Sequence, residues 1–136
     1  MRKLAGMRLT PGMMRDNTID AETNSGLVLP DTFLLNNFLG RKVNGKTEVY
    51  FSIMYLGANV TSNSAGNIAD VLGPVLPPAW RPSETVIGVF DRSGTAKGSL
   101  TVVSSGLITF KTLSATAILA ENHNLSASIG WLSQNN

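Results

Sequence analysis

The side chains that most often catalyse reactions or bind metals are few and widely separated in this sequence. His123 is the only histidine and there is no cysteine, so a thiolate metal site and a cysteine–histidine pair are both excluded. The acidic residues Asp70, Glu84, Asp91 and Glu121 lie in separate segments. Acid–base catalysis by carboxylates needs two such groups close together, and a lone histidine has no second base or ligand. We therefore predict no catalytic, cofactor-binding or metal-binding residues, and a protein that is not an enzyme.

Aromatic side chains offer another chemistry, because their rings stack on sugar rings. Tyr50 lies on the polar side of an alternating segment, whereas Trp80 and Arg81 lie in a proline-rich segment, residues 75–82. Its three prolines exclude a helix interior and indicate a stiff, extended connector. Two interpretations stay open: Trp80 folds inward with the stem of Arg81 along its ring, or both residues form an exposed sugar platform. Tyr50, Trp80 and Arg81 are therefore the candidate glycan contacts.

Residues 1–25 form a second candidate site, for docking on another protein. Basic residues come first and acidic residues follow, and methionine side chains adapt well to irregular apolar surfaces. The predicted docking residues are Arg2, Lys3, Met7, Arg8, Leu9, Met13, Met14 and Arg15. The alternative is a solvated tail. Asn24-Ser25-Gly26 separates this arm from a domain of residues 26–136, and no strand pattern is recognised before it.

The composition of the chain indicates a single, weakly charged domain. Of 136 residues, 43% are apolar, which is enough for one core, but only 15% are charged and 13 are glycine. A net charge of +2 is too small to argue for nucleic-acid binding. No apolar run is long enough to cross a membrane.

Short alternating segments separated by turn residues recur along the chain and predict strands. They cover residues 27–29, 32–43, 49–55, 68–75, 85–90, 97–103, 107–112, 115–119 and 125–132, with an irregularity near residues 36 and 37. Asn44-Gly45 predicts a two-residue hairpin turn, and Trp131 continues an apolar face that we expect to be buried. The pattern predicts an all-β fold, an antiparallel β-sandwich or jelly-roll-like head preceded by an extended N-terminal arm.

Five segments between residues 38 and 132 carry a family resemblance. They are residues 38–45 with the strand at 49–55, residues 65–70, residues 76–82, residues 106–112 and residues 125–131. In this order and spacing the chain resembles the β-sandwich head domain of tailed-bacteriophage virion-surface proteins, particularly minor tail and fibre-tip proteins; residues 6–13 also resemble short openings of such proteins. The resemblance implies a homotrimer whose edge strands are covered by neighbours, and it implies no catalytic residues. The long trunk and coiled-coil heptads of fibre proteins are missing from this sequence.

Two functions are compatible with the arm and the resemblance. The first is a capsid decoration protein: a trimer on the virion surface, made in the host cytoplasm and anchored to the major capsid protein through its arm. The alternative is a minor tail or tail-fibre-tip protein that binds a glycan of the host cell surface. Both are non-enzymatic structural roles without a cofactor, nucleic-acid binding or membrane insertion.

Overall fold

The chain folds into a curled antiparallel sheet, as seen in a computed structural model that describes residues 19–132. Eight strands follow the order β1-β2-β3-β10-β6-β7-β8-β5, and β4 pairs with β9 in a separate two-stranded sheet. The strands are β1 (Ile19–Thr23), β2 (Phe33–Val43), β3 (Lys46–Tyr55), β4 (Val60–Thr61), β5 (Asn67–Val75), β6 (Val86–Arg92), β7 (Ala96–Val102), β8 (Leu107–Thr112), β9 (Ile118–Leu119) and β10 (Asn124–Leu132). A short 3-10 turn, Pro78–Trp80, precedes β6. The predicted all-β, antiparallel fold is confirmed.

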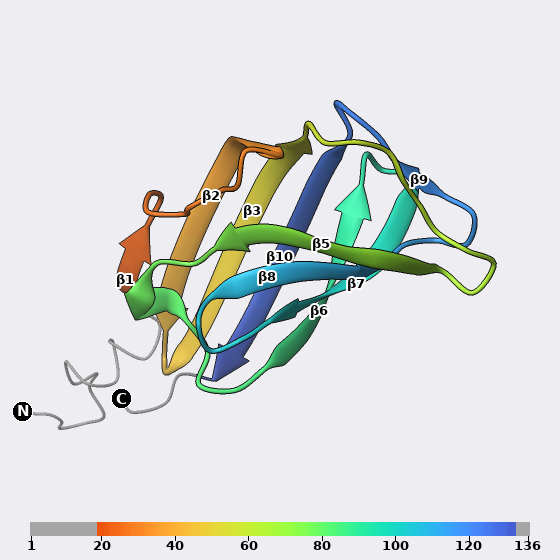
Figure 1. Cartoon of the computed structure of the whole chain (residues 1–136). Helices are drawn as coiled ribbons and strands as arrows, with labels where there is room; N and C mark the ends of the chain where they lie inside the picture. Colours follow the sequence, from red (N-terminus) through yellow and green to blue (C-terminus); the bar gives the residue numbers. More distant parts are fainter. Residues whose placement is uncertain (1–18, 133–136) are drawn as a thin grey trace, which may run out of the picture.

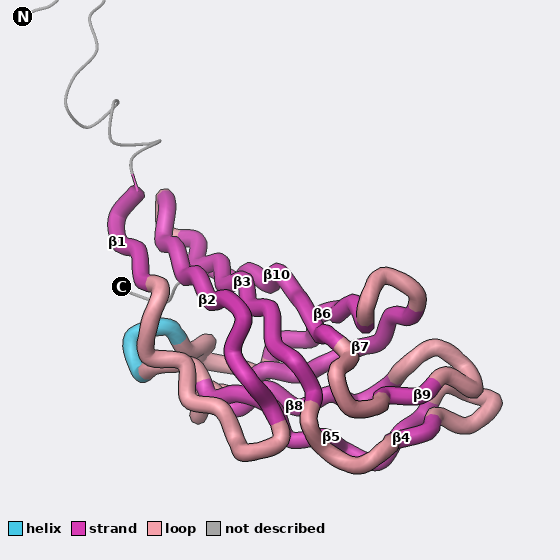
Figure 2. The backbone as a smooth tube through the Cα atoms, turned by 90° about the horizontal axis from the view of Figure 1, so that it is seen from above, coloured by secondary structure: helices cyan, strands magenta, loops and turns pink. Residues whose placement is uncertain are grey.

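The curl of the sheet brings its two ends over each other, so that it forms a half-barrel around one core. In Figure 1, β5 and β8 pass across β3 and β10. Figure 2, which is turned by 90°, shows that β5 and β8 are displaced from β3 and β10 along the viewing direction of Figure 1. The Phe110 ring of β8 meets Phe33 of β2, Phe51 of β3 and Phe90 of β6, with ring centroids 5.7, 6.3 and 4.8 Å away. Side chains from both groups of strands therefore fill a shared interior.

The β2–β3 hairpin forms as its sequence predicts. Asn44 and Gly45 both have positive φ, 53° and 79°, as a type I′ turn requires. The expected irregularity is a bulge between Leu35 and Asn37. It leaves the remainder of β2 in register with β3, whose alternate residues, from Thr47 to Tyr55, are buried. The outward-facing residues of β3 therefore include Tyr50.

Three strand predictions need correction. Residues 27–29 do not form a strand: Val28 makes an isolated bridge to Val75, with backbone N···O distances of 3.0 and 2.8 Å, between Gly26 at φ 96° and Pro30. The strand expected at 115–119 is reduced to Ile118–Leu119. Residues 19–23, by contrast, form β1 beside β2, so the expectation of no strand before Asn24 is wrong. Pairing with a long neighbouring strand has organised a segment that lacks alternation of its own.

Trp131 is half-buried rather than fully inside the core. It continues the inward row of Leu125, Ala127 and Ile129, which are buried as predicted. The ring packs on the edge of the core, beside Val86 and Pro82 in a surface hollow. The alternation therefore predicted the direction of the side chain correctly, but not how much of it is covered.

We expect Trp131→Ala to lower the free energy of unfolding by about 1–2 kcal/mol, because full burial of a large aromatic residue corresponds to about 3–5 kcal/mol. Trp80→Ala, at a buried position, is the matched comparison and should cost more. Urea denaturation followed by circular dichroism measures both. Equal losses for the two variants would show that Trp131 is as well packed as Trp80.

Candidate functional site

Trp80, the first candidate glycan contact, points into the protein. It is 7% exposed, and its ring lies so close to β2 that a Cβ on Gly40 would stand 2.9 Å from the ring atom Cε3. The Lys42 ammonium lies 4.9 Å from the ring centroid and donates a hydrogen bond to the Ala79 carbonyl at 2.7 Å. Of the two interpretations of the connector, the inward plug is confirmed.

The guanidinium of Arg81 is held by the connector backbone. Its Nε donates a hydrogen bond to the Leu76 carbonyl at 2.9 Å, and the side chain packs over Gly106, which has φ 88°. Lys42 occupies the cation position over Trp80 instead. The interpretation as an exposed Trp80–Arg81 platform is therefore wrong. The 3-10 turn directs the Trp80 ring inward, and a backbone carbonyl of the connector accepts a hydrogen bond from the Arg81 side chain.

Tyr50 lies on the opposite, outer face of the sheet. It pairs with Leu39, whereas the adjacent Gly40, which touches Trp80, pairs with Val49. Successive residues of a strand face opposite sides, so the rings of Tyr50 and Trp80 cannot meet on one surface. The structure does not bring the three candidate glycan contacts together, and Tyr50 alone offers an aromatic ring on this face within residues 19–132.

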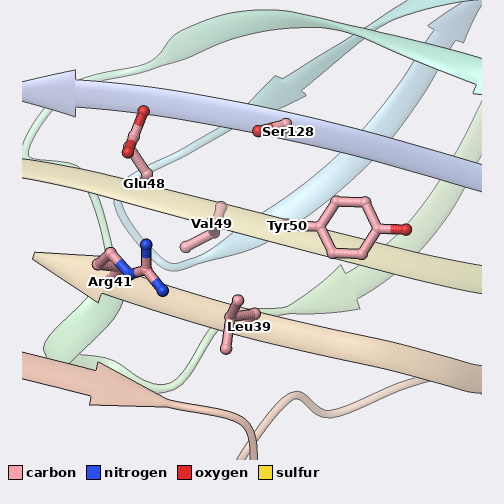
Figure 3. Close-up of a pocket in the computed structure, with 6 residues that line it drawn as sticks. All are labelled: Leu39, Arg41, Glu48, Val49, Tyr50 and Ser128. Atoms are coloured by element: carbon pink, nitrogen blue, oxygen red, sulfur yellow. The ribbon is translucent and has the colours of Figure 1, made fainter.

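The surroundings of Tyr50 form a shallow, polar-edged surface. Figure 3 looks onto the outer face and shows the Tyr50 ring nearly face-on, so the ring lies along the sheet with one side outward. The side chain is 37% exposed. A hollow of about 150 Å³ beside it is lined by Leu39, Arg41, Glu48, Val49, Tyr50 and Ser128. A second hollow shares Tyr50 and Ser128 and adds Val89, Phe90, Asp91, Lys97, Ser126 and Ala127.

Each of the two hollows has one acidic and one basic side chain at its edge. Arg41 is paired with Glu22 of β1 at 3.0 Å, and Glu48 with Lys46 at 3.4 Å. These exposed pairs contribute little to stability and are free to exchange partners. The face therefore suits a ligand or protein surface without a large net charge.

His123, Asp91 and Asp70 have structural partners. His123 Nδ1 accepts a hydrogen bond from the Ala120 amide at 2.9 Å, and Asp91 accepts one from the Gly94 amide at 2.7 Å. Asp70 pairs with Lys111 at 2.8 Å. Among residues 19–132, no three histidine, cysteine or acidic residues are grouped as metal ligands, and no helix is long and apolar enough to cross a membrane.

The docking residues predicted in the arm lie outside the described residues. They are Arg2, Lys3, Met7, Arg8, Leu9, Met13, Met14 and Arg15. The described part of the arm is β1, which pairs with β2 and carries the Glu22–Arg41 ion pair. Ile19, the first described residue, pairs with Val43, next to the hairpin turn at Asn44 and Gly45.

Exposed apolar side chains on β6 are a feature that was not among the predicted site residues. Ile87 is 75% exposed and Val89 is 64% exposed, whereas Phe90, the next residue of β6, is buried. Gly88 takes an inward position because the Ile129 side chain fills the space where its Cβ would stand, 3.2 Å away. A glycine between two branched aliphatic residues was the available signal that the larger side chains point outward.

The sequence was also compared with known proteins. No protein-family model matches it, and no curated protein matches it. The surface features of residues 19–132 that bear on function are the outer face around Tyr50 and the exposed aliphatic residues of β6.

Proposed function

We propose that this chain is a non-enzymatic structural protein of a tailed-phage virion, displayed on the particle exterior as a homotrimer. The favoured role is a capsid decoration protein whose N-terminal arm binds the major capsid protein. The observation that carries the proposal is the exposed apolar surface of the sheet. Its most exposed members are Ile87, Leu132, Val89, Val28, Leu72 and Leu34.

This surface favours assembly, because apolar side chains exposed to water have a free-energy cost that a covering partner removes. Fully burying one aliphatic side chain stabilises an interface by about 1.5–3 kcal/mol. Ile87 and Val89 lie on one face of β6, and the neighbouring outward residues of β10, Ser126 and Ser128, are small and uncharged. A partner that covers Ile87 and Val89 would therefore meet small side chains on β10, with one acidic and one basic side chain, Asp91 and Lys97, at the edge of the contact.

The proposed head is a β-sandwich of jelly-roll type, preceded by an extended arm of residues 1–25 that ends in β1. The packing of β8 and β5 over β2, β3 and β10 supports the sandwich-like description. The resemblance to phage virion-surface heads, and the basic, methionine-bearing sequence of residues 1–15, support a location on the virion.

A second function is favoured by one observation at Tyr50. An outward ring face with acidic and basic side chains on both sides is a suitable surface for a sugar ring, as expected of a minor tail or fibre-tip protein that binds a host surface glycan. Trp80 and Arg81 make no contribution to such a site. An image of the particle that places the protein on the shell or on the tail would separate the two roles.

Removing residues 1–17 is expected to abolish attachment to the particle while leaving the head folded, because β1 and its pairing with β2 are retained. The melting temperature should change by no more than about 2 °C, which for a domain of this size is a fraction of 1 kcal/mol. Light scattering should give three times the mass of the corresponding monomer for both forms, and the monomer mass of the whole chain is 14.5 kDa. Binding is measured by adding each form to particles that lack the protein.

Two outcomes would contradict this expectation. If the truncated chain bound particles as tightly as the whole chain, the arm would not be the anchor. If the whole chain were a monomer at micromolar concentration, the homotrimer would have to be abandoned, while the particle assay would still report on attachment.

A further inference from the structure

The hairpin turn between β2 and β3 presents two residues to water. Val43 and Lys46 are the last residues that pair in the ladder of these strands. Asn44 and Gly45 lie between them, beyond the ladder, and both are exposed. Water therefore reaches the side chain of Asn44 and the backbone of Gly45 directly.

The backbone nitrogen of Gly45 is also open to approach from the preceding side chain. Asn44 and Gly45 both have positive φ, 53° and 79°. Apart from Gly45 and the residues next to it, no atom of the described residues lies within 4 Å of the place where a Cβ of Gly45 would stand. Glycine has no side chain that shields its own nitrogen. The peptide that joins the two residues can therefore rotate without displacing a packed group.

An asparagine followed by an open glycine can react within its own backbone. When a base removes the proton of the Gly45 nitrogen, this nitrogen can attack Cγ of Asn44 and form a five-membered succinimide ring. The bond between Cγ and Nδ2 breaks, and the amide nitrogen leaves as ammonia. Two groups held in one molecule react as if at very high concentration, so the step needs no enzyme.

We propose that Asn44-Gly45 is a site of spontaneous modification, at which Asn44 is converted to isoaspartate or aspartate. Water adds to one of the two carbonyl carbons of the succinimide and breaks its bond to the Gly45 nitrogen. Opening at the side-chain carbon gives aspartate, and opening at the backbone carbon gives isoaspartate. Only water is consumed and only ammonia is released, so this inference goes beyond the proposed function and does not depend on it.

Isoaspartate alters the hairpin because the main chain then passes through the former side chain and is one carbon atom longer. A two-residue type I′ loop fits its strands because its twist matches theirs, and a longer loop loses this match. The row of paired residues at this end of the sheet runs from Ile19 through Val43 and Lys46 to Leu132. Formation of isoaspartate therefore loosens the Val43–Lys46 pair and, through it, the end of the sheet.

Two other asparagines serve as internal controls. Asn122 is exposed and has a positive φ of 73°, but the next amide, that of His123, donates a hydrogen bond to the Ala120 carbonyl at 3.1 Å. Asn63 is exposed, but its side-chain oxygen accepts hydrogen bonds from two backbone amides at 2.9 and 3.0 Å. The attacking nitrogen is held in the first control, and the carboxamide is held in the second.

The proposal is tested by incubating the folded full chain in mildly alkaline buffer and mapping its peptides by mass spectrometry. The peptide that contains Asn44 should gain the mass difference between a hydroxyl and an amino group, and chromatography should separate its isoaspartate and aspartate forms. Asn44 should convert about 10-fold or more faster than Asn63 or Asn122, because hydrogen bonds must first break at the two controls. Equal rates at the three sites would overturn the proposal.

The same incubation in concentrated urea shows whether the folded turn permits the reaction. Conversion of Asn63 should become faster in urea, because its hydrogen bonds are lost, whereas conversion of Asn44 should change much less. If Asn44 reacted in urea but stayed intact in the folded chain, the turn would protect it and the proposal would be wrong.

The variant Asn44→Asp separates the effect of charge from that of the longer backbone. It has the charge of the product but keeps the two-residue loop, so its melting temperature should equal that of the unmodified chain. The purified isoaspartate form should melt at a lower temperature, and the amides of Val43 and Lys46 should exchange faster with solvent. An isoaspartate form as stable and as slowly exchanging as Asn44→Asp would refute the predicted loosening of the hairpin.

Discussion

Replacing Gly98 by alanine is expected to lower the free energy of unfolding by about 3 kcal/mol or more, since backbone has to move to relieve the overlap. Gly98 lies in β7 opposite Phe90. A Cβ at this position would stand 1.9 Å from the Thr112 carbonyl oxygen and 2.8 Å from Cε1 of the Phe90 ring. Any shift that makes room also strains the hydrogen bond from the Ser99 amide to Thr112 Oγ1, now 2.9 Å long.

Urea denaturation of Gly98→Ala would measure this loss, with Gly130→Ala as the control. Gly130 is also a strand glycine, but the atom nearest to its added Cβ is Cε of Lys46, 3.0 Å away at the end of a flexible side chain. The control should therefore change stability by less than about 1 kcal/mol. If both variants lost a similar free energy of unfolding, the close approach of other atoms to Gly98 would not be the cause of the loss.

Replacing Phe110 by alanine is expected to cost about 3–5 kcal/mol, as for other large aromatic truncations in cores. Phe110 is completely buried and its ring contacts three other phenylalanine rings, from β2, β3 and β6. Alanine would leave a cavity where these strands meet and remove ring contacts worth about 0.5–1.5 kcal/mol each.

The effect is enlarged because β8 is not a ladder neighbour of β2, β3 or β6. The ring contacts of Phe110 therefore join strands across the interior that no hydrogen-bonded ladder joins to β8. Calorimetry of Phe110→Ala and of Phe110→Leu, which keeps most of the volume, would test this. An alanine variant no less stable than the leucine variant would place the centre of the core elsewhere.

Local signals in the sequence determined most of the strands and several turns. Asn44-Gly45 specified the hairpin because few other residue pairs tolerate positive φ at both positions. Alternation assigned the buried faces of β3 and β10, since side chains one residue apart point to opposite sides of a sheet. These signals involve residues that are neighbours in the chain, which is why no tertiary information was needed.

Part of the candidate site was also accessible from sequence. The outward direction of Tyr50 followed from alternation in β3, whereas for Trp80 the sequence left an inward and an exposed position open, and the structure shows the inward one. The contact between Trp80 and Lys42 could not be predicted, because Lys42 lies in β2 and is 38 positions away in the chain. The predicted docking residues of the arm, from Arg2 to Arg15, stay a prediction, since they lie outside the described part of the chain.

Contacts between distant segments were decided by the tertiary structure alone. Whether residues 19–23 form a strand depends on the edge that β2 offers them, and whether Trp131 is covered depends on how far β6 follows β10. The same holds for the row that places Ile19 and Leu132 at one end of the sheet. Strand pairing is set by the sum of many weak, non-local contacts, so no short stretch of this sequence contains the information that determines which strands are neighbours in the sheet.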